Sequence, residues 1–201
     1  MSFISPRDSE FKRFYSQEVE MLFSALDCVL HGQHVLYCSS ELTSGLNLFQ
    51  ALRQHGLKTR DDLRQQMGEA WYKANILDVN AAAAVEFAAQ ARRAIPAGTI
   101  VVTPAPFSAP NWDQRQYLAF WEKLLRKPVG LVWFNRNWQF SNGCALEFAV
   151  AQNAGLPTFD HAGNPLGCRE GIELLMAAIV QLEADGFDAS TLRENLARLA
   201  P

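Results

Sequence analysis

The segment 129–159, VGLVWFNRNWQFSNGCALEFAVAQNAGLPTF, constrains the fold of this chain most strongly. Residues 129–134 are a short apolar run rich in β-branched and aromatic side chains, which is typical of a buried strand. After a polar loop, apolar residues recur every four positions, as on one buried face of a helix, and Gly155 with Pro157 marks the helix end. Residues 158–159 then return to an extended pattern. The segment therefore predicts strand, loop, helix and strand, a unit that closes by a right-handed crossover in a parallel sheet.

The rest of the chain repeats this alternation of strands and helices. Buried strands are predicted at 34–39 and 99–103, and a weaker one near 57–60. Helical spacing or composition predicts helices at 8–31, 46–55, 81–94, 114–126, 169–184 and 189–199. We therefore expect an α/β protein of the flavodoxin-like or Rossmann-like three-layer type, with a mostly parallel sheet of four to five strands.

The length of 201 residues suits one α/β domain. We expect residues 1–33 to form an N-terminal helical extension, residues 34–160 a nucleotide-binding-like core, and residues 161–201 the C-terminal helices. Apolar residues make up 49% of the chain and charged residues 19%, a composition of globular rather than disordered proteins.

Charge, hydropathy and cysteine spacing exclude several classes of function. The net charge is −3 and no basic stripe is visible, so duplex nucleic acid is not an expected partner. No apolar run approaches the length of a membrane span, and the first residues are too polar for a signal peptide. The four cysteines lie far apart without a CxxC pair, which argues against a zinc site and a dense disulfide framework. We expect a cytoplasmic protein without a metal or redox cofactor.

Glu147 is the one acidic residue of the segment 129–159, and it lies near the start of the predicted helix. In an open parallel sheet, ligands bind in the crevice beyond the carboxyl ends of the strands, so Glu147 is expected to face that crevice. Backbone N–H groups at the helix start can hold an anion or a sugar hydroxyl beside it. The alternative is structural, because acids in a first helical turn often complement the helix dipole.

The motif around Glu147 resembles the signature of the nucleoside 2-deoxyribosyltransferase-like superfamily. The matching residues are Ser141-Asn142-Gly143-Cys144-Ala145-Leu146-Glu147-Phe148-Ala149, followed by Ala151, Gly155, Leu156 and Pro157. The resemblance spans roughly residues 34–160 and is most specific over 138–157. It implies a nucleoside or nucleotide N-glycosidase or deoxyribosyltransferase, with Glu147 as nucleophile on the anomeric carbon. It also implies a homo-oligomer, because a neighbouring subunit often completes the pocket in this superfamily.

The first strand and its turn are a second candidate part of the site. The resemblance implies that this strand lines the substrate pocket, and Tyr37 and Ser39 are the nearest candidates. A strand followed by a Ser/Thr/Gly turn and a helix is a pattern typical of an anion or ribose site. The same pattern is equally typical of a solvated loop that caps a helix. The hydroxyls of Ser39, Ser44 and Ser141 suit a 5′-phosphate of the ligand.

Two loops supply further candidates. Trp112 lies in a stiff, proline-rich loop that suits the wall of a nucleobase site, because base–aromatic stacking contributes about 1–3 kcal/mol. The next residue, Asp113, is a candidate proton donor to the leaving base and equally a natural N-cap. Asn135, Asn137 and Trp138 occupy the loop where superfamily members often carry an acid, and asparagine can read a base edge or a sugar hydroxyl.

These residues together favour cleavage or transfer at an N-glycosidic bond. Such chemistry needs a carboxylate at the anomeric carbon and a donor that helps the base leave. The missing acid before the motif leaves open a second hypothesis, a non-catalytic sensor that binds a nucleotide-derived ligand. A third is an interaction protein that uses the aromatic face of the N-terminal helix.

Overall fold

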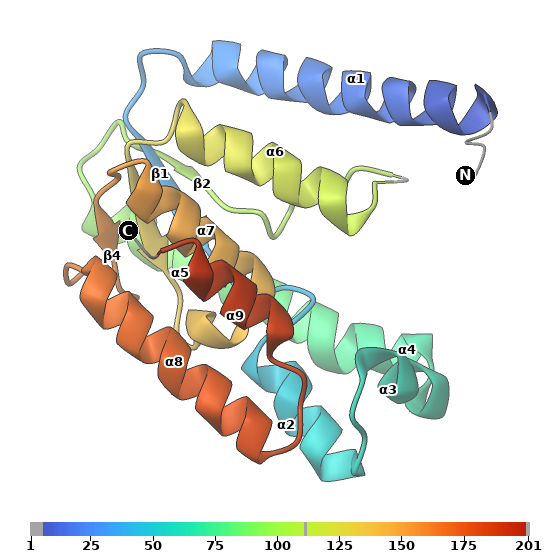
Figure 1. Ribbon diagram of the computed structural model, residues 1–201. Helices are drawn as coiled ribbons and strands as arrows, with labels where there is room; N and C mark the ends of the chain where they lie inside the picture. Colours follow the sequence, from blue (N-terminus) through green and yellow to red (C-terminus); the bar gives the residue numbers. More distant parts are fainter. Residues whose placement is uncertain (1–5, 111, 200–201) are drawn as a thin grey trace.

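Four parallel strands form the central sheet of this protein (Figure 1). The computed structural model describes residues 6–110 and 112–199. The strands are β1 (Val35–Ser39), β2 (Ile100–Val102), β3 (Leu131–Phe134) and β4 (Thr158–Phe159), in the order β2-β1-β3-β4. This order and the flanking helices confirm the predicted flavodoxin-like or Rossmann-like three-layer fold.

Helices make up most of the remaining chain. They are α1 (Pro6–Leu30), α2 (Leu46–His55), α3 (Arg60–Met67), α4 (Glu69–Tyr72), the π-helix η1 (Lys73–Leu77), α5 (Asp78–Ala94), α6 (Gln114–Arg126), the 3₁₀ turn η2 (Trp138–Phe140), α7 (Asn142–Asn153), α8 (Cys168–Ala184) and α9 (Ser190–Ala197). The helix predicted at 81–94 begins earlier, at Asp78, because it continues directly from η1.

The strand predicted near 57–60 is wrong. Thr59 is instead the N-cap of α3, and its side chain accepts a hydrogen bond of 3.1 Å from the backbone N–H of Asp62. The Asp62 carboxylate accepts a bond of 3.1 Å from the Thr59 backbone N–H in return. This reciprocal capping box starts a helix at Arg60, and residues 57–60 form no strand.

Side chains alternate between the two faces of the sheet, as the period of a strand requires. Leu36 and Cys38 of β1 face the side covered by α5, where they pack with Phe87 and with Trp133 of β3. The intervening residues of β1 face the larger core, which α2, α6, α7 and α8 help to build. All five residues of β1 are buried, so this strand lies at the centre of the fold.

Helix α7 is buried around most of its circumference, and not only on the face that the four-residue spacing indicates. Seven of its twelve residues are buried, including Ala145, Phe148 and Ala151. The helix packs against α6, α8 and α9 (Figure 1). An apolar helix enclosed on all sides needs no polar face, and its small alanines permit the close approach of its neighbours.

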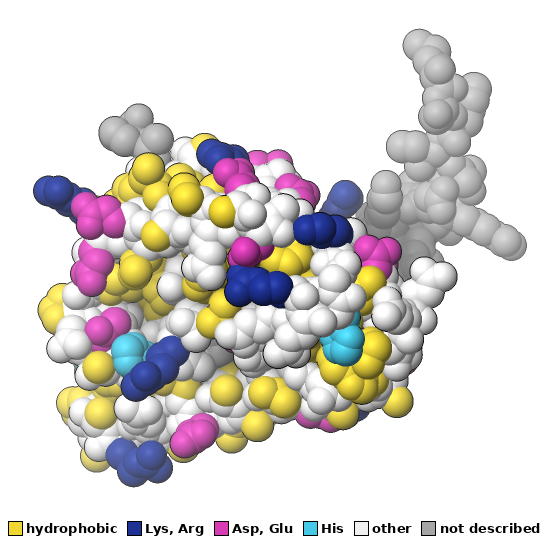
Figure 2. Space-filling model, turned by 90° about the horizontal axis from the view of Figure 1, so that it is seen from below, with side chains coloured by type: hydrophobic (Ala, Val, Ile, Leu, Met, Phe, Trp, Pro, Cys, Tyr) yellow, Lys and Arg dark blue, Asp and Glu magenta, His cyan; other side chains and the backbone are white. Residues whose placement is uncertain are grey.

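The outer surface carries charges of both signs. Figure 2 shows acidic and basic side chains interspersed on the viewed face, without a broad area of one sign. Oppositely charged side chains of the surface pair, as Arg193 does with Glu183 at 2.7 Å and Lys127 with Asp27 at 3.0 Å. Over residues 6–110 and 112–199, no helix has both the length and the apolar character that a membrane span requires.

A substitution in α8 tests the packing against α7. A Cβ at Gly171 would overlap the ring of Phe148, which is fully buried against Phe134 and Trp138. We expect Gly171→Ala to lower the free energy of unfolding by about 1–3 kcal/mol, because overpacking outweighs the gain in helix propensity. Gly167→Ala is the control for steric overlap, since no described residue lies within 4 Å of its Cβ position; as the N-cap of α8, it loses only the capping preference of glycine. Urea unfolding measures both; equal stabilities of the two variants would contradict this packing.

Candidate functional site

A cavity of about 280 Å³ opens at the carboxyl ends of β1 and β3. The direction in which strands are added to the sheet reverses at this point: β2 lies on one side of β1, and β3 lies on the other. Its lining comes from the β1–α2 loop, the β2–α6 loop, helix α6, and the first two turns of α7 with its N-cap. Parallel α/β sheets bind ligands at such a switch point, so the topology and the cavity agree on where the site lies.

The carboxyl group of Glu147 lies in this cavity and is held by two donors from β1. Tyr37 donates from Oη to Glu147 Oε1 at 2.7 Å, and Ser39 donates from Oγ to Glu147 Oε2 at 2.6 Å. Tyr37 and Ser39 are two residues apart on a strand, so their side chains point to the same face. Each oxygen of Glu147 therefore has its own hydroxyl donor, and both bonds tie α7 to β1.

Burial dominates the electrostatics of Glu147. The residue is only 7% exposed, and desolvation raises the pKa of its carboxyl from 4.5 to about 7, although the bonds from Ser39 and Tyr37 lower it. Burial, and then the charge of Glu147, holds the pKa of Tyr37 well above 10, so the phenol stays protonated and donates. Near neutral pH, both the acid and the carboxylate form of Glu147 are populated.

The position of Glu147 in α7 argues against the dipole explanation. Ser141 is the N-cap of the helix and accepts from the Cys144 backbone N–H at 3.4 Å. Glu147 lies six residues beyond Ser141, in the second turn, whereas the dipole effect falls off within the first turn. A buried acid there with two hydroxyl donors fits a site better than a surface charge that complements the helix.

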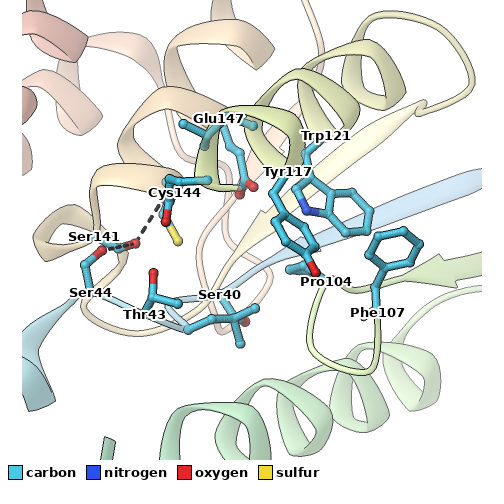
Figure 3. A pocket seen from close by; sticks show the side chains of 14 residues that line it. Ser40, Thr43, Ser44, Pro104, Phe107, Tyr117, Trp121, Ser141, Cys144 and Glu147 are labelled. Atoms are coloured by element: carbon cyan, nitrogen blue, oxygen red, sulfur yellow. Dashed lines mark hydrogen bonds between the residues drawn. The ribbon is translucent and has the colours of Figure 1, made fainter. Parts of the chain in front are cut away.

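Hydroxyl side chains form one wall of the cavity, which we call the hydroxyl wall: Ser40, Thr43, Ser44 and Ser141. Figure 3 shows the oxygens of Thr43, Ser44 and Ser141 on one side of Glu147. The Ser44 and Ser141 hydroxyls are 3.4 Å apart, so they connect the β1–α2 loop to the start of α7.

Neighbouring helices anchor the loop that carries most of the hydroxyl wall. The buried Asn80 donates to the carbonyl oxygen of Leu42 at 2.9 Å, and Tyr72 donates to that of Thr43 at 3.1 Å. Both donors flank the π-helix η1, one just before it and one shortly after it. This helical unit therefore fixes the backbone of the pocket loop.

The opposite wall is aromatic. Phe107, Tyr117 and Trp121, which we call the aromatic wall, line the cavity with Pro104 (Figure 3). Phe107 lies 5.2 Å from Trp121 and 6.1 Å from Tyr117 between ring centroids. Such rings offer a flat apolar surface that suits an aromatic heterocycle.

Several predicted site residues meet at this cavity. Glu147, Ser44, Ser141 and Gly143 line it directly. Tyr37 and Ser39 reach it through their bonds to the Glu147 carboxyl.

The structure places the predicted proton donor elsewhere. Asp113 is exposed and is the N-cap of α6, where its Oδ1 accepts from the Gln116 backbone N–H at 2.9 Å. The Gln116 side chain accepts from the Asp113 backbone N–H in return, at 2.8 Å. Asp113 is not part of the cavity lining, so its position corresponds to the capping alternative.

Five further candidates also lie outside the cavity lining. Trp112 packs behind the aromatic wall, with its ring 5.3 Å from that of Tyr117. Trp138 is a core residue between Phe134 and Phe148. The others belong to the local backbone: the Asn135 side chain accepts from the Arg136 N–H, Asn137 has a left-handed φ of 62°, and the Asn142 carbonyl accepts from Asn195.

Some lining residues were not among the sequence candidates, namely Ser40, Thr43, Phe107, Tyr117, Trp121 and Cys144. Ser40 and Thr43 lie in the same polar turn as Ser44, so the number of hydroxyl side chains in that turn could have indicated them as lining residues. Tyr117 and Trp121 are four residues apart on α6, a spacing that also marks a core face. Only the arrangement in space distinguishes them from ordinary core residues.

Glu41 occupies the helix start that the sequence suggested as an anion site. Its Oε2 accepts from the Leu46 backbone N–H at 3.0 Å, and burial raises the pKa of this carboxyl from 4.5 to about 7. A Cβ at Gly45 would collide with this carboxyl, and Gly45 has a φ of 127°, so glycine is required there. The N-terminus of α2 is therefore filled by the protein's own carboxyl group.

Neither the arrangement of possible metal ligands nor comparison with known proteins indicates what this site binds. Across the part of the chain that the structure describes, no group of three or more His, Cys, Asp or Glu residues is placed to hold a metal ion. Comparison with protein-family models, curated proteins and solved structures finds no match to this chain.

The raised pKa of Glu147 predicts how stability depends on pH. The folded state holds the Glu147 proton more tightly than the unfolded chain, so this proton stabilises the fold fully below pH 4.5. That contribution is lost as the pH rises through about 7. The change from 4.5 to about 7 corresponds to roughly 3 kcal/mol at about 1.4 kcal/mol per pKa unit.

We expect Glu147→Gln to gain stability relative to the wild type between pH 5 and pH 8, by an amount on the order of 2–3 kcal/mol. Urea unfolding at the two pH values measures it. Glu41 is present in both proteins, so its own titration cancels in the difference. A stability difference that stays constant with pH would mean that Glu147 titrates at its ordinary pKa.

Proposed function

We propose that this protein cleaves or transfers at the N-glycosidic bond of a nucleoside or nucleotide, as an N-glycosidase or 2-deoxyribosyltransferase-like enzyme. The observation that carries the proposal is the Glu147 carboxyl, buried and held at both oxygens between a hydroxyl wall and an aromatic wall. A nucleoside has the same division, with a polar sugar, a flat base, and the reacting carbon between them.

The cavity size supports a small ligand. A volume of about 280 Å³ lies at the lower end of the range of about 300–1,000 Å³ that is usual for ligand sites. This favours a single nucleoside or nucleotide over a dinucleotide. The base would stack on the aromatic wall, and the sugar would face the hydroxyl wall.

The chemistry proposed for Glu147 requires its carboxylate form. A carboxylate oxygen bonds to the anomeric carbon as the carbon–nitrogen bond breaks, and the base leaves with that electron pair and takes up a proton from solvent water. Water or a second base then attacks the anomeric carbon and gives up a proton to solvent, and the bond from the carbon to the Glu147 oxygen breaks, which releases the carboxylate. The hydroxyls of Tyr37 and Ser39 hold the carboxylate in one orientation through both steps.

A second candidate function is ligand binding without catalysis. Among residues 6–110 and 112–199, Glu147 is the one carboxylic acid in the cavity lining. The Tyr117 hydroxyl, which lies in the aromatic wall, already donates to the Ala109 carbonyl oxygen at 3.1 Å. A site with one acid and no second acidic group to protonate the base favours a sensor of nucleotide-derived ligands.

A base-release assay tests the proposed function. Wild type and Glu147→Gln are incubated with a panel of nucleosides and 5′-monophosphates, and free base is quantified by chromatography. We expect release by the wild type and a loss of at least about 10³-fold in the variant, because the amide cannot act as the nucleophile. Asp113→Asn keeps a capping side chain and is expected to retain activity.

Two outcomes would redirect the proposal. No base release by either protein, with nucleoside binding still detectable by thermal shift, would favour the sensor. Loss of activity in Asp113→Asn with unchanged stability would make Asp113 the proton donor.

The pH profile of the reaction gives an independent prediction. Because the carboxylate is the reactive form, the rate should rise with pH through about 7 and then level off. Tyr37→Phe removes a hydrogen bond that favours the carboxylate, so its profile should shift to higher pH. Initial rates from pH 5 to pH 9 measure both. A profile of Tyr37→Phe that coincides with the wild type would show that this bond does not act on Glu147.

A further inference from the structure

The cavity holds an acid that can attack a sugar but no group suited to protonate a leaving base. Among the described residues, Glu147 is the one carboxylic acid of the lining, and the other lining side chains offer only alcohols, one amide and one thiol as donors. Burial, and then the charge of Glu147, raises the pKa of the Cys144 thiol, so this thiol is a poor acid. The Tyr117 hydroxyl donates to the Ala109 carbonyl oxygen at 3.1 Å and accepts from the Ala109 N–H at 2.9 Å. A neutral base would therefore leave without general acid catalysis by these residues.

The charges around the cavity are negative. The described lining contains no Lys, Arg or His, and Glu147 is ionised in its reactive form. Glu41 adds a second carboxyl in the β1–α2 loop, between the lining residues Ser40 and Leu42. Its charge acts on the lining, because after burial and Glu147 it is a further cause that raises the pKa of Cys144. Such a site attracts a ligand that brings a positive charge.

The aromatic wall suits a ligand whose positive charge lies on a flat ring. The faces of Phe107, Tyr117 and Trp121 carry the negative part of the ring quadrupole, so they attract a cation and also stack with a planar heterocycle. The charge and the shape of the cavity thus favour the same kind of base.

We propose that the substrate is a nucleoside whose base is a cationic heteroaromatic ring, in the simplest case an N-glycosyl pyridinium. This inference rests on the proposed function, because it names the leaving group of that reaction. The ring nitrogen bonded to the anomeric carbon carries the positive charge in such a compound. When an oxygen of Glu147 bonds to that carbon, the electron pair of the carbon–nitrogen bond passes to the nitrogen, and a neutral pyridine leaves without taking up a proton. Water then attacks the anomeric carbon and gives one proton to solvent, and the carboxylate is released.

Base release by the wild type tests the leaving group. The substrates are the pyridinium, adenine and uracil nucleosides, each with ribose and with 2′-deoxyribose. We expect kcat/KM to be at least about 10²-fold higher for the pyridinium compounds, because general acid catalysis, which contributes about 10²–10⁴-fold, is missing for the neutral bases.

A binding experiment tests the charge separately from the chemistry. Calorimetry at pH 8.5 in the Glu147→Gln background compares N-ribosyl pyridinium with C-ribosyl benzene, which has the same shape without the charge. We expect the pyridinium compound to bind roughly tenfold tighter, and Glu41→Gln to reduce this preference several-fold, because the amide keeps an acceptor for the Leu46 N–H but loses the charge. Asp62→Asn is the matched control, since it removes the charge of an exposed capping acid outside the cavity lining, and it should leave the preference unchanged.

The outcomes separate this inference from the proposed function. Release of adenine or uracil with a kcat/KM equal to that of pyridine would overturn the cationic base, while the N-glycosidase activity stands. Equal affinities for the charged and the neutral riboside would also overturn it. Absence of base release from every compound would overturn the proposed function, and this inference with it.

Discussion

The buried carboxyl of Glu147 is the constraint on which the rest of this structure depends. An acid in a low-dielectric interior is costly unless hydrogen bonds or protonation stabilise it. Here the hydroxyls of Tyr37 and Ser39 in β1 donate hydrogen bonds to the two carboxyl oxygens. Burial still raises the pKa of the acid to about 7. The same contacts join the central strand to the central helix. A group that destabilises the ionised fold is thus placed at the ligand cavity, where active-site residues commonly carry such strain.

The surrounding elements both bury this acid and fix its position. Helix α7 is enclosed by α6, α8 and α9, so the direction of Glu147 is set by packing on several sides. The pocket loop after β1 is held by Asn80 and Tyr72, which flank the π-helix η1. Extra turns of this kind often occur near functional sites, and here the turn lies between the two residues that anchor the hydroxyl wall. Rigid support of this sort keeps a reactive group in one geometry.

Much of this fold is predictable from local sequence patterns. The four parallel strands follow from short apolar runs, and the switch point follows from their order once the sheet is known. The strand near 57–60 failed because a capping box at Thr59 and Asp62 competes with β propensity. The helix α7 was predicted from its periodicity, but the burial of its other faces was not, because periodicity says nothing of how many neighbours a helix has.

The site was predictable where a residue's role follows from its strand or motif. Tyr37, Ser39, Ser141 and Glu147 were candidates from sequence, and the structure brings them together. Asp113 and Trp138 have residue types that suit a site, but capping and core packing use the same side chains. The aromatic wall depends on contacts between distant segments, which no local pattern encodes.

The most direct test is to trap the covalent intermediate that we propose on Glu147. A nucleoside with fluorine at C2′ slows the breakdown of a glycosyl ester, because the fluorine destabilises the cation-like transition state. Mass spectrometry of the intact chain and its peptides then locates the sugar. We expect one fluorosugar per chain, attached to Glu147 and absent from Glu147→Gln. Release of base with the sugar on another residue, or on none, would contradict the central role of Glu147.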